Sequence, residues 1–150
     1  MKRLVVCADG TWNTPDQQDQ GRLSPTNVWK MYEAVRRCRT APDGIEQMAH
    51  YEPGVGAYPK GLAGLAMRVR MLFTRKNRQG SIYQGITGDG LDDIIMSCYA
   101  WLVKHHEPGD EIYVFGYSRG AYTVRSLAGM IRKCGLLRRG CHCGQRVYLK

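Results

Sequence analysis

Residues 111–120 read EIYVFGYSRG and lead into AYTVRSLAGMIRKCG, residues 121–135. The apolar run before Gly116 is typical of a buried strand, and the apolar positions after Ser118 recur at helical spacing. Glycines two residues before and after a serine let a strand and a helix approach closely. The stretch therefore predicts a nucleophile elbow with Ser118 as its serine and Gly116 and Gly120 as its glycines. The alternative is a glycine-rich turn in which the serine only caps the helix.

A nucleophilic serine also needs backbone amides that stabilise an oxyanion. The amide of Arg119, which opens the predicted helix, is one candidate. A second amide would come from a loop that follows another strand. The loop DGT, residues 9–11, follows the first apolar run of the chain, so we expect the amide of Gly10 or Thr11 to complete the oxyanion hole. Asp9 and Tyr117 are expected to form the wall of the site, although a loop aspartate also accepts hydrogen bonds from local amides.

The remaining apolar patterns alternate strands with helices. Strands are expected at residues 2–8, 45–52 and 111–116, and helices at 26–38, 90–106 and 118–135. Asn27 is the expected N-cap of the first helix. This order predicts a three-layer α/β fold with a mainly parallel sheet. The amphipathic stretch 61–73 is expected to cover the sheet, with a lid or a lipid-facing patch as the alternative.

Length and composition indicate one soluble domain. The chain has 150 residues, and no apolar run approaches the length of a membrane span. The apolar stretch near the N-terminus is too short for a signal peptide, so we expect a cytoplasmic protein, with non-Sec secretion as an effector as the alternative. The oligomeric state is left open by the sequence.

The six cysteines are expected to be reduced. Four of them lie in apolar patterns and are expected to be small core residues: Cys7, Cys38, Cys98 and Cys134. The sequence CHC at 141–143 lacks a second ligand pair at zinc-site spacing. We therefore predict no metal site and no cofactor.

The positive charge is concentrated at the C-terminal end. The net charge is +9, yet residues 1–118 carry 14 Lys+Arg against 13 Asp+Glu, whereas residues 119–150 carry 8 Lys+Arg and no acid. Such a segment suits an anionic membrane surface, and no specific nucleic acid is expected as a partner.

The segment VVCADGT offers a rival interpretation. Phosphatases of the haloacid dehalogenase type begin with an apolar strand that ends in Asp-x-Asp-Gly-Thr. Here Cys7 occupies the position of the first, nucleophilic aspartate. A thiol there also removes a hard oxygen ligand for Mg²⁺, which counts against this interpretation.

The partners of Ser118 are not evident. In α/β-hydrolases the acid and the histidine follow the serine. Here no Asp or Glu follows Ser118, and His142 is the one histidine that does. His50, His105 and His106 precede the serine and would need an unusual order. A serine without a base is a weak nucleophile.

Five segments together resemble one family: VVCADGTWN, TNVWKMYEAV, YEPGVG, GDGLDDIIMSCYAWL and PGDEIYVFGYSRGAYTVRSLAGMIRKCGLL. It is a family of uncharacterised α/β-hydrolase-like proteins that includes the catalytic domain of type VI secretion phospholipase effectors. The resemblance implies that Ser118 is the triad serine and that the loop 9–11 lines the site. It runs from about residue 3 to residue 137. We expect residues 1–137 to be the N-terminal part of such a domain and 138–150 to be a divergent basic tail.

The resemblance implies a serine hydrolase that cleaves carboxylic or phospholipid acyl esters. Because the acid and the histidine are not found, the 150 residues by themselves are expected to be an inactive, truncated copy. The alternative is an inactive remnant or a basic module that binds anionic lipid or nucleic acid.

Overall fold

The computed structural model describes residues 1–54 and 90–137 of the chain. The described elements, in chain order, are β1 (Lys2–Ala8), β2 (Gln18–Asp19), β3 (Arg22–Leu23), α1 (Asn27–Arg37), β4 (Glu46–Glu52), α4 (Leu91–His105), β5 (Glu111–Gly116) and α5 (Arg119–Cys134). The three predicted strands and three predicted helices are confirmed to within a few residues. The small hairpin of β2 and β3 was not predicted, and the stretch 61–73 lies outside the described residues.

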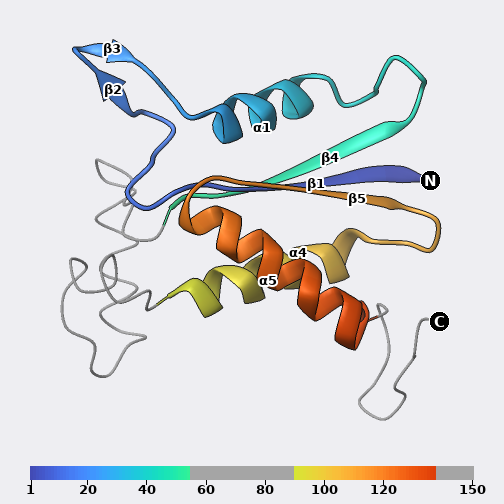
Figure 1. Ribbon diagram of the computed structural model, residues 1–150. Helices are drawn as coiled ribbons and strands as arrows, with labels where there is room; N and C mark the ends of the chain where they lie inside the picture. Colours follow the sequence, from blue (N-terminus) through green and yellow to red (C-terminus); the bar gives the residue numbers. More distant parts are fainter. Residues whose placement is uncertain (55–89, 138–150) are drawn as a thin grey trace, which may run out of the picture.

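The main sheet is parallel and has the strand order β4-β1-β5. Helix α1 covers one face, and α4 and α5 cover the other (Figure 1). The predicted α/β class and parallel sheet are therefore confirmed. In the register, Ala8 lies between Glu52 and Gly116, so the three strands end together at one edge of the sheet.

The central strand β1 is buried on both faces, which explains its continuous apolar run. Leu4 and Val6 pack toward α4 and α5 with Cys98, Leu102 and Leu127. Val5 and Cys7 pack toward α1 with Val28 and Val35. The core is thus divided by the sheet into two layers, as the alternation of side chains along a strand requires.

Two of the four predicted core cysteines are not in the core. Cys7 and Cys98 are buried free thiols, as predicted, whereas Cys38 and Cys134 are free but exposed. Cys38 is the C-cap of α1 and Cys134 is the last residue of α5. Both lie at the C-terminal end of their helix and outside the packed core, so helical spacing alone placed them wrongly.

The N-cap of α1 is Thr26 and not Asn27. The hydroxyl of Thr26 accepts a hydrogen bond of 3.1 Å from the amide of Trp29, and the backbone of Thr26 is extended. Asn27 is the first helical residue. No helix in the described residues combines the length and the apolar character that a membrane span requires.

Candidate active site

Ser118 lies in a strained turn between β5 and α5. It is one of the non-glycine residues with positive φ, at φ 53° and ψ −121°. Such a conformation costs free energy of about 1–3 kcal/mol and is concentrated at functional sites. The side chain is exposed and makes no capping hydrogen bond to α5. The hydroxyl is therefore available for chemistry, which the helix-cap alternative does not account for.

Gly116 and Gly120 bring the strand and the helix into backbone contact. A Cβ at Gly120 would lie 2.6 Å from the Ala8 carbonyl carbon, and a Cβ at Gly116 would lie 2.7 Å from the amide nitrogen of Ala121. Both separations are too short for any side chain. The glycines fix how closely α5 approaches β1 and hence where Ser118 stands.

The loop after β1 packs directly against the elbow. A Cβ at Gly10 would lie 2.8 Å from Cδ1 of Tyr117 and 3.1 Å from Cβ of Ser118. The amide of Tyr117 also donates a 3.1 Å hydrogen bond to the carbonyl of Ala8. The expected neighbourhood of the loop 9–11 and the elbow is therefore present in the structure.

The Asp9 carboxylate holds this loop in place through hydrogen bonds. Its side chain is buried, and Oδ1 accepts hydrogen bonds from the amide of Gly10 at 2.8 Å and from Nδ2 of Asn13 at 3.4 Å. Oδ2 accepts from the hydroxyls of Thr26 at 2.6 Å and Tyr51 at 2.9 Å. Burial, together with the Asp9 carboxylate, raises the pKa of Tyr51, which keeps its phenol a donor. Asp9 is a scaffold carboxylate of the site.

The backbone amides near Ser118 differ in whether they already donate a hydrogen bond. The amide of Gly10 is engaged by the Asp9 carboxylate. Within residues 1–54 and 90–137, the amides of Thr11 and Arg119 have no acceptor. Gly120 and Ala121 donate to the carbonyls of Tyr117 and Ser118 in the first turn of α5.

A groove of about 570 Å³ opens beside the elbow. It lies between the loop after β1, the start of α1 and the end of β5, and its lining is largely polar. Its walls include Asn13, Gln17, Thr26, Lys30 and Tyr117. The side-chain oxygen of Gln17 is buried and has no partner among the described residues.

The buried thiols are not nucleophiles. Burial, together with the Asp9 carboxylate, raises the pKa of Cys7 to about 12, and burial, together with Glu52, raises the pKa of Cys98 to about 12. Both are therefore neutral at pH 7. Cys7 also points into the core beneath α1, which removes it from the position that the phosphatase interpretation requires.

No described histidine serves Ser118 as a base. His50 pairs with Glu52 at 2.9 Å, and Nδ1 of His105 lies 2.8 Å from the Trp101 carbonyl. Within the described residues, the Ser118 hydroxyl has no hydrogen-bond partner at all, and His142 lies outside them. Among the described residues, the structure therefore places an exposed serine beside the loop 9–11, without a histidine in contact with its hydroxyl.

The sequence did not predict which residues contact Asp9. Tyr51 meets Asp9 because β4 pairs with β1 in the register Cys7↔Tyr51, and that pairing is not encoded in local spacing. The polar cluster of His50, Glu52 and Cys98 was missed for the same reason. The alternation of β4, with His50 and Glu52 on one face and Tyr51 on the other, was the available signal.

Comparison with known proteins identifies the family of the chain. Residues 2–148 match the family described as "T6SS, Phospholipase effector Tle1-like, catalytic domain". The chain belongs to this family. The matched range includes most of the segment 138–150, whose divergence from the family remains a prediction.

The chain is also 37% identical over 139 residues to "Uncharacterized protein YEL023C" of Saccharomyces cerevisiae. The alignment covers 93% of this chain and 18% of the yeast protein, so the chain spans less than a fifth of that relative. No solved structure matches the chain. The suspected family is thereby confirmed.

Proposed function

We propose that this protein is a serine hydrolase that cleaves acyl esters of phospholipids, with Ser118 as the nucleophile in an α/β-hydrolase elbow. The observation that carries the proposal is the strained, exposed Ser118 at the start of α5, whose hydroxyl has no hydrogen-bond partner among the described residues. The description of its family names the catalytic domain of a phospholipase effector. This description supports a lipid ester as the substrate class.

In the proposed reaction, Oγ of Ser118 bonds to the ester carbonyl carbon while its proton passes to a general base. The negative charge that develops on the carbonyl oxygen is stabilised by two backbone amides. Arg119 and Thr11 supply them, because their amides have no acceptor among the described residues. The Gly10 amide, the other candidate, already donates to Asp9. Collapse of the intermediate breaks the ester C–O bond and releases the lipid alcohol, and water then hydrolyses the acyl-enzyme.

The base and the acid are supplied by residues other than those described. This follows because no described histidine contacts Ser118. The polar groove beside Tyr117 accepts the headgroup side of the substrate, and Lys30 in its lining offers a cation to a phosphate. The stretch 61–73 and the basic residues after Ser118 contact the anionic membrane surface in this proposal.

The test uses the full-length protein as its own cells produce it. Purified protein is incubated with phosphatidylglycerol vesicles, and the released fatty acid is measured together with labelling by a fluorophosphonate probe. We expect fatty-acid release and a probe adduct mapped to Ser118. Ser118→Ala abolishes both, whereas Ser126→Ala, the control on the same helix, retains both. Release or labelling that survives Ser118→Ala would overturn the proposal.

The charge distribution favours a second candidate, a basic module that binds anionic lipid without hydrolysis. The supporting observation is the 8 Lys+Arg and absent acids of residues 119–150. This candidate predicts salt-sensitive sedimentation with phosphatidylglycerol vesicles, unaffected by Ser118→Ala and unaccompanied by fatty-acid release.

A further inference from the structure

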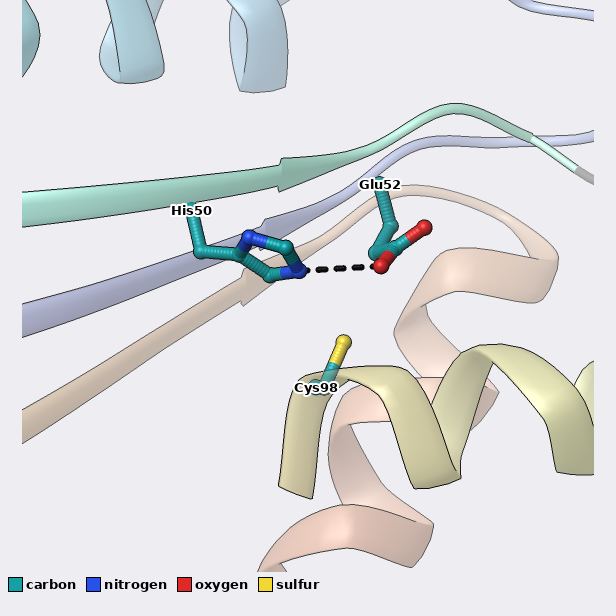
Figure 2. Close-up of side chains that lie close together, drawn as sticks. All are labelled: His50, Glu52 and Cys98. Carbon is teal, nitrogen blue, oxygen red and sulfur yellow. Dashed lines mark hydrogen bonds and ion pairs between the residues drawn. The ribbon is translucent and has the colours of Figure 1, made fainter. Parts of the chain in front are cut away.

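His50, Glu52 and Cys98 form a compact cluster on the side of the sheet away from α1. His50 and Glu52 are two residues apart on β4 and point to the same face, toward α4 (Figure 2). Cys98 points up from α4 between them. One donor atom from each residue can be chosen so that all three lie within 4.8 Å of one another. This cluster plays no part in the reaction proposed for Ser118.

The spacing is close to what a metal ion needs. Zinc binds nitrogen, oxygen and sulfur at about 2.0–2.3 Å, which in a tetrahedron separates neighbouring donors by about 3.4–3.6 Å. Nε2 of His50 and Oε1 of Glu52 are 2.9 Å apart, so they would have to separate slightly. The Cys98 sulfur would have to approach the other two donors by at most about 1.4 Å, given the tetrahedral spacing.

Neighbouring groups hold two of the donors in place. The ring of His50 stacks on Trp101 with centroids 5.1 Å apart and an angle of 15° between planes. The hydroxyl of Ser97 donates to Oε1 of Glu52. Oriented donors of this kind are typical of metal ligands, whose outer partners fix ring and carboxylate positions.

The cluster is also accessible. The side chains of His50 and Glu52 are 22% and 17% exposed, whereas Cys98 is fully buried. An ion could therefore enter from the solvent past His50 and Glu52 and bind the Cys98 thiolate on its buried side. Sulfur, nitrogen and oxygen together favour zinc over magnesium or calcium, which prefer oxygen alone.

We propose that His50, Glu52 and Cys98 bind a zinc ion through three protein ligands and leave a fourth position for water. Binding displaces the proton of the Cys98 thiol to solvent and joins β4 to α4. The carbonyl of Glu52 accepts the amide of Asp9 at 2.9 Å, so the ion would also stiffen the strand end on which the loop 9–11 rests. None of the three proposed ligands belongs to the sequence CHC at 141–143.

The test compares metal binding by the whole chain and by four variants after chelator treatment. Cobalt(II) serves as a spectroscopic substitute for zinc, because thiolate coordination gives a sulfur-to-cobalt charge-transfer band. Cys98→Ala removes the thiolate, and His50→Gln removes a partly exposed ligand with little risk to folding. Cys134→Ser changes an exposed thiol, and the double variant Cys141→Ser with Cys143→Ser removes the other cysteine pair.

We expect one zinc per chain, a charge-transfer band with cobalt, and an increase in Tm on adding zinc. His50→Gln and Cys98→Ala lower the affinity by more than about 100-fold, beyond the range typical of outer partners. Cys134→Ser and the 141/143 double variant retain the band and the Tm shift. The proposal is overturned if the parent binds no zinc, or if the double variant loses binding while His50→Gln keeps it.

Discussion

Replacing Gly120 with alanine would place a methyl group inside the contact between β1 and the first turn of α5. An ideal Cβ there lies 2.6 Å from the carbonyl carbon of Ala8 and 2.6 Å from the carbonyl oxygen of Asp9. Real Cβ atoms essentially never come within 3.0 Å of other atoms. Because both neighbours are backbone atoms, no rotamer change can relieve the overlap, and α5 must move away from β1.

The expected cost is about 3 kcal/mol, the upper end of the range for overpacked sites. Gly129 provides a matched control on the same helix, since a Cβ there meets no atom within 4 Å. Alanine is a better helix former than glycine by about 0.8–1 kcal/mol, so Gly129→Ala should stabilise the protein slightly. The two variants should therefore differ by about 4 kcal/mol.

The assay is urea unfolding of the parent and both variants, followed by circular dichroism, with the midpoint compared at constant slope. A Gly120→Ala variant within about 0.5 kcal/mol of the parent, or one as stable as Gly129→Ala, would refute the close strand–helix approach. It would also remove the physical basis for the position assigned to Ser118.

Two further predictions concern stability. Thr26→Ala removes the cap of α1 and a donor to the buried Asp9 carboxylate, so it should cost about 2–3 kcal/mol in urea unfolding. The adjacent Asn27→Ala should stay within about 0.5 kcal/mol, and equal effects would contradict the assignment of the cap. Burial alone would raise the pKa of Asp110, but hydrogen bonds from Lys2 and from a backbone amide outweigh it and lower that pKa to about 2. The resulting stabilisation of about 2 kcal/mol is present above pH ~4 and is lost as the pH falls toward 2. Asp110→Asn should therefore destabilise the protein at pH 7 and converge with the parent near pH 2, and a pH-independent difference would count against the ion pair.

The sequence predicted the order of the elements because each has a clear apolar period. β1 is buried on both faces and reads as a continuous apolar run, and α5 follows a serine between two glycines. What local spacing could not predict is which residues at the end of a helix lie outside the packed core. Cys38 and Cys134 therefore seemed equivalent to Cys98 in the sequence but are exposed in the structure.

The geometry of the candidate site could be predicted where it depends on one continuous stretch of the chain. It was missed where it depends on the pairing of strands. Ser118, Gly116 and Gly120 are close in sequence, and their geometry follows from the turn they form. The anchoring of Asp9 by Tyr51 depends on the parallel register of β1 and β4. The engagement of the Gly10 amide by Asp9 depends on the same folded loop, as does the lack of an acceptor for the Thr11 and Arg119 amides among the described residues.

The most direct test of the central claim needs no general base. Ser118→Cys, made together with Cys38→Ser, Cys141→Ser and Cys143→Ser, places a titratable thiol at the elbow, and its alkylation by iodoacetamide is followed against pH. Cys134, exposed at the opposite end of α5, serves as the internal reference in the same molecule. Backbone amides without an acceptor among the described residues, such as those of Thr11 and Arg119, and a helix N-terminus stabilise a thiolate. We therefore predict that the pKa of the introduced thiol is about 1 unit or more below the ordinary value of about 8.5. It should also lie below the pKa measured for Cys134. A pKa equal to or above that of Cys134 would contradict the claim that Ser118 faces groups able to stabilise negative charge.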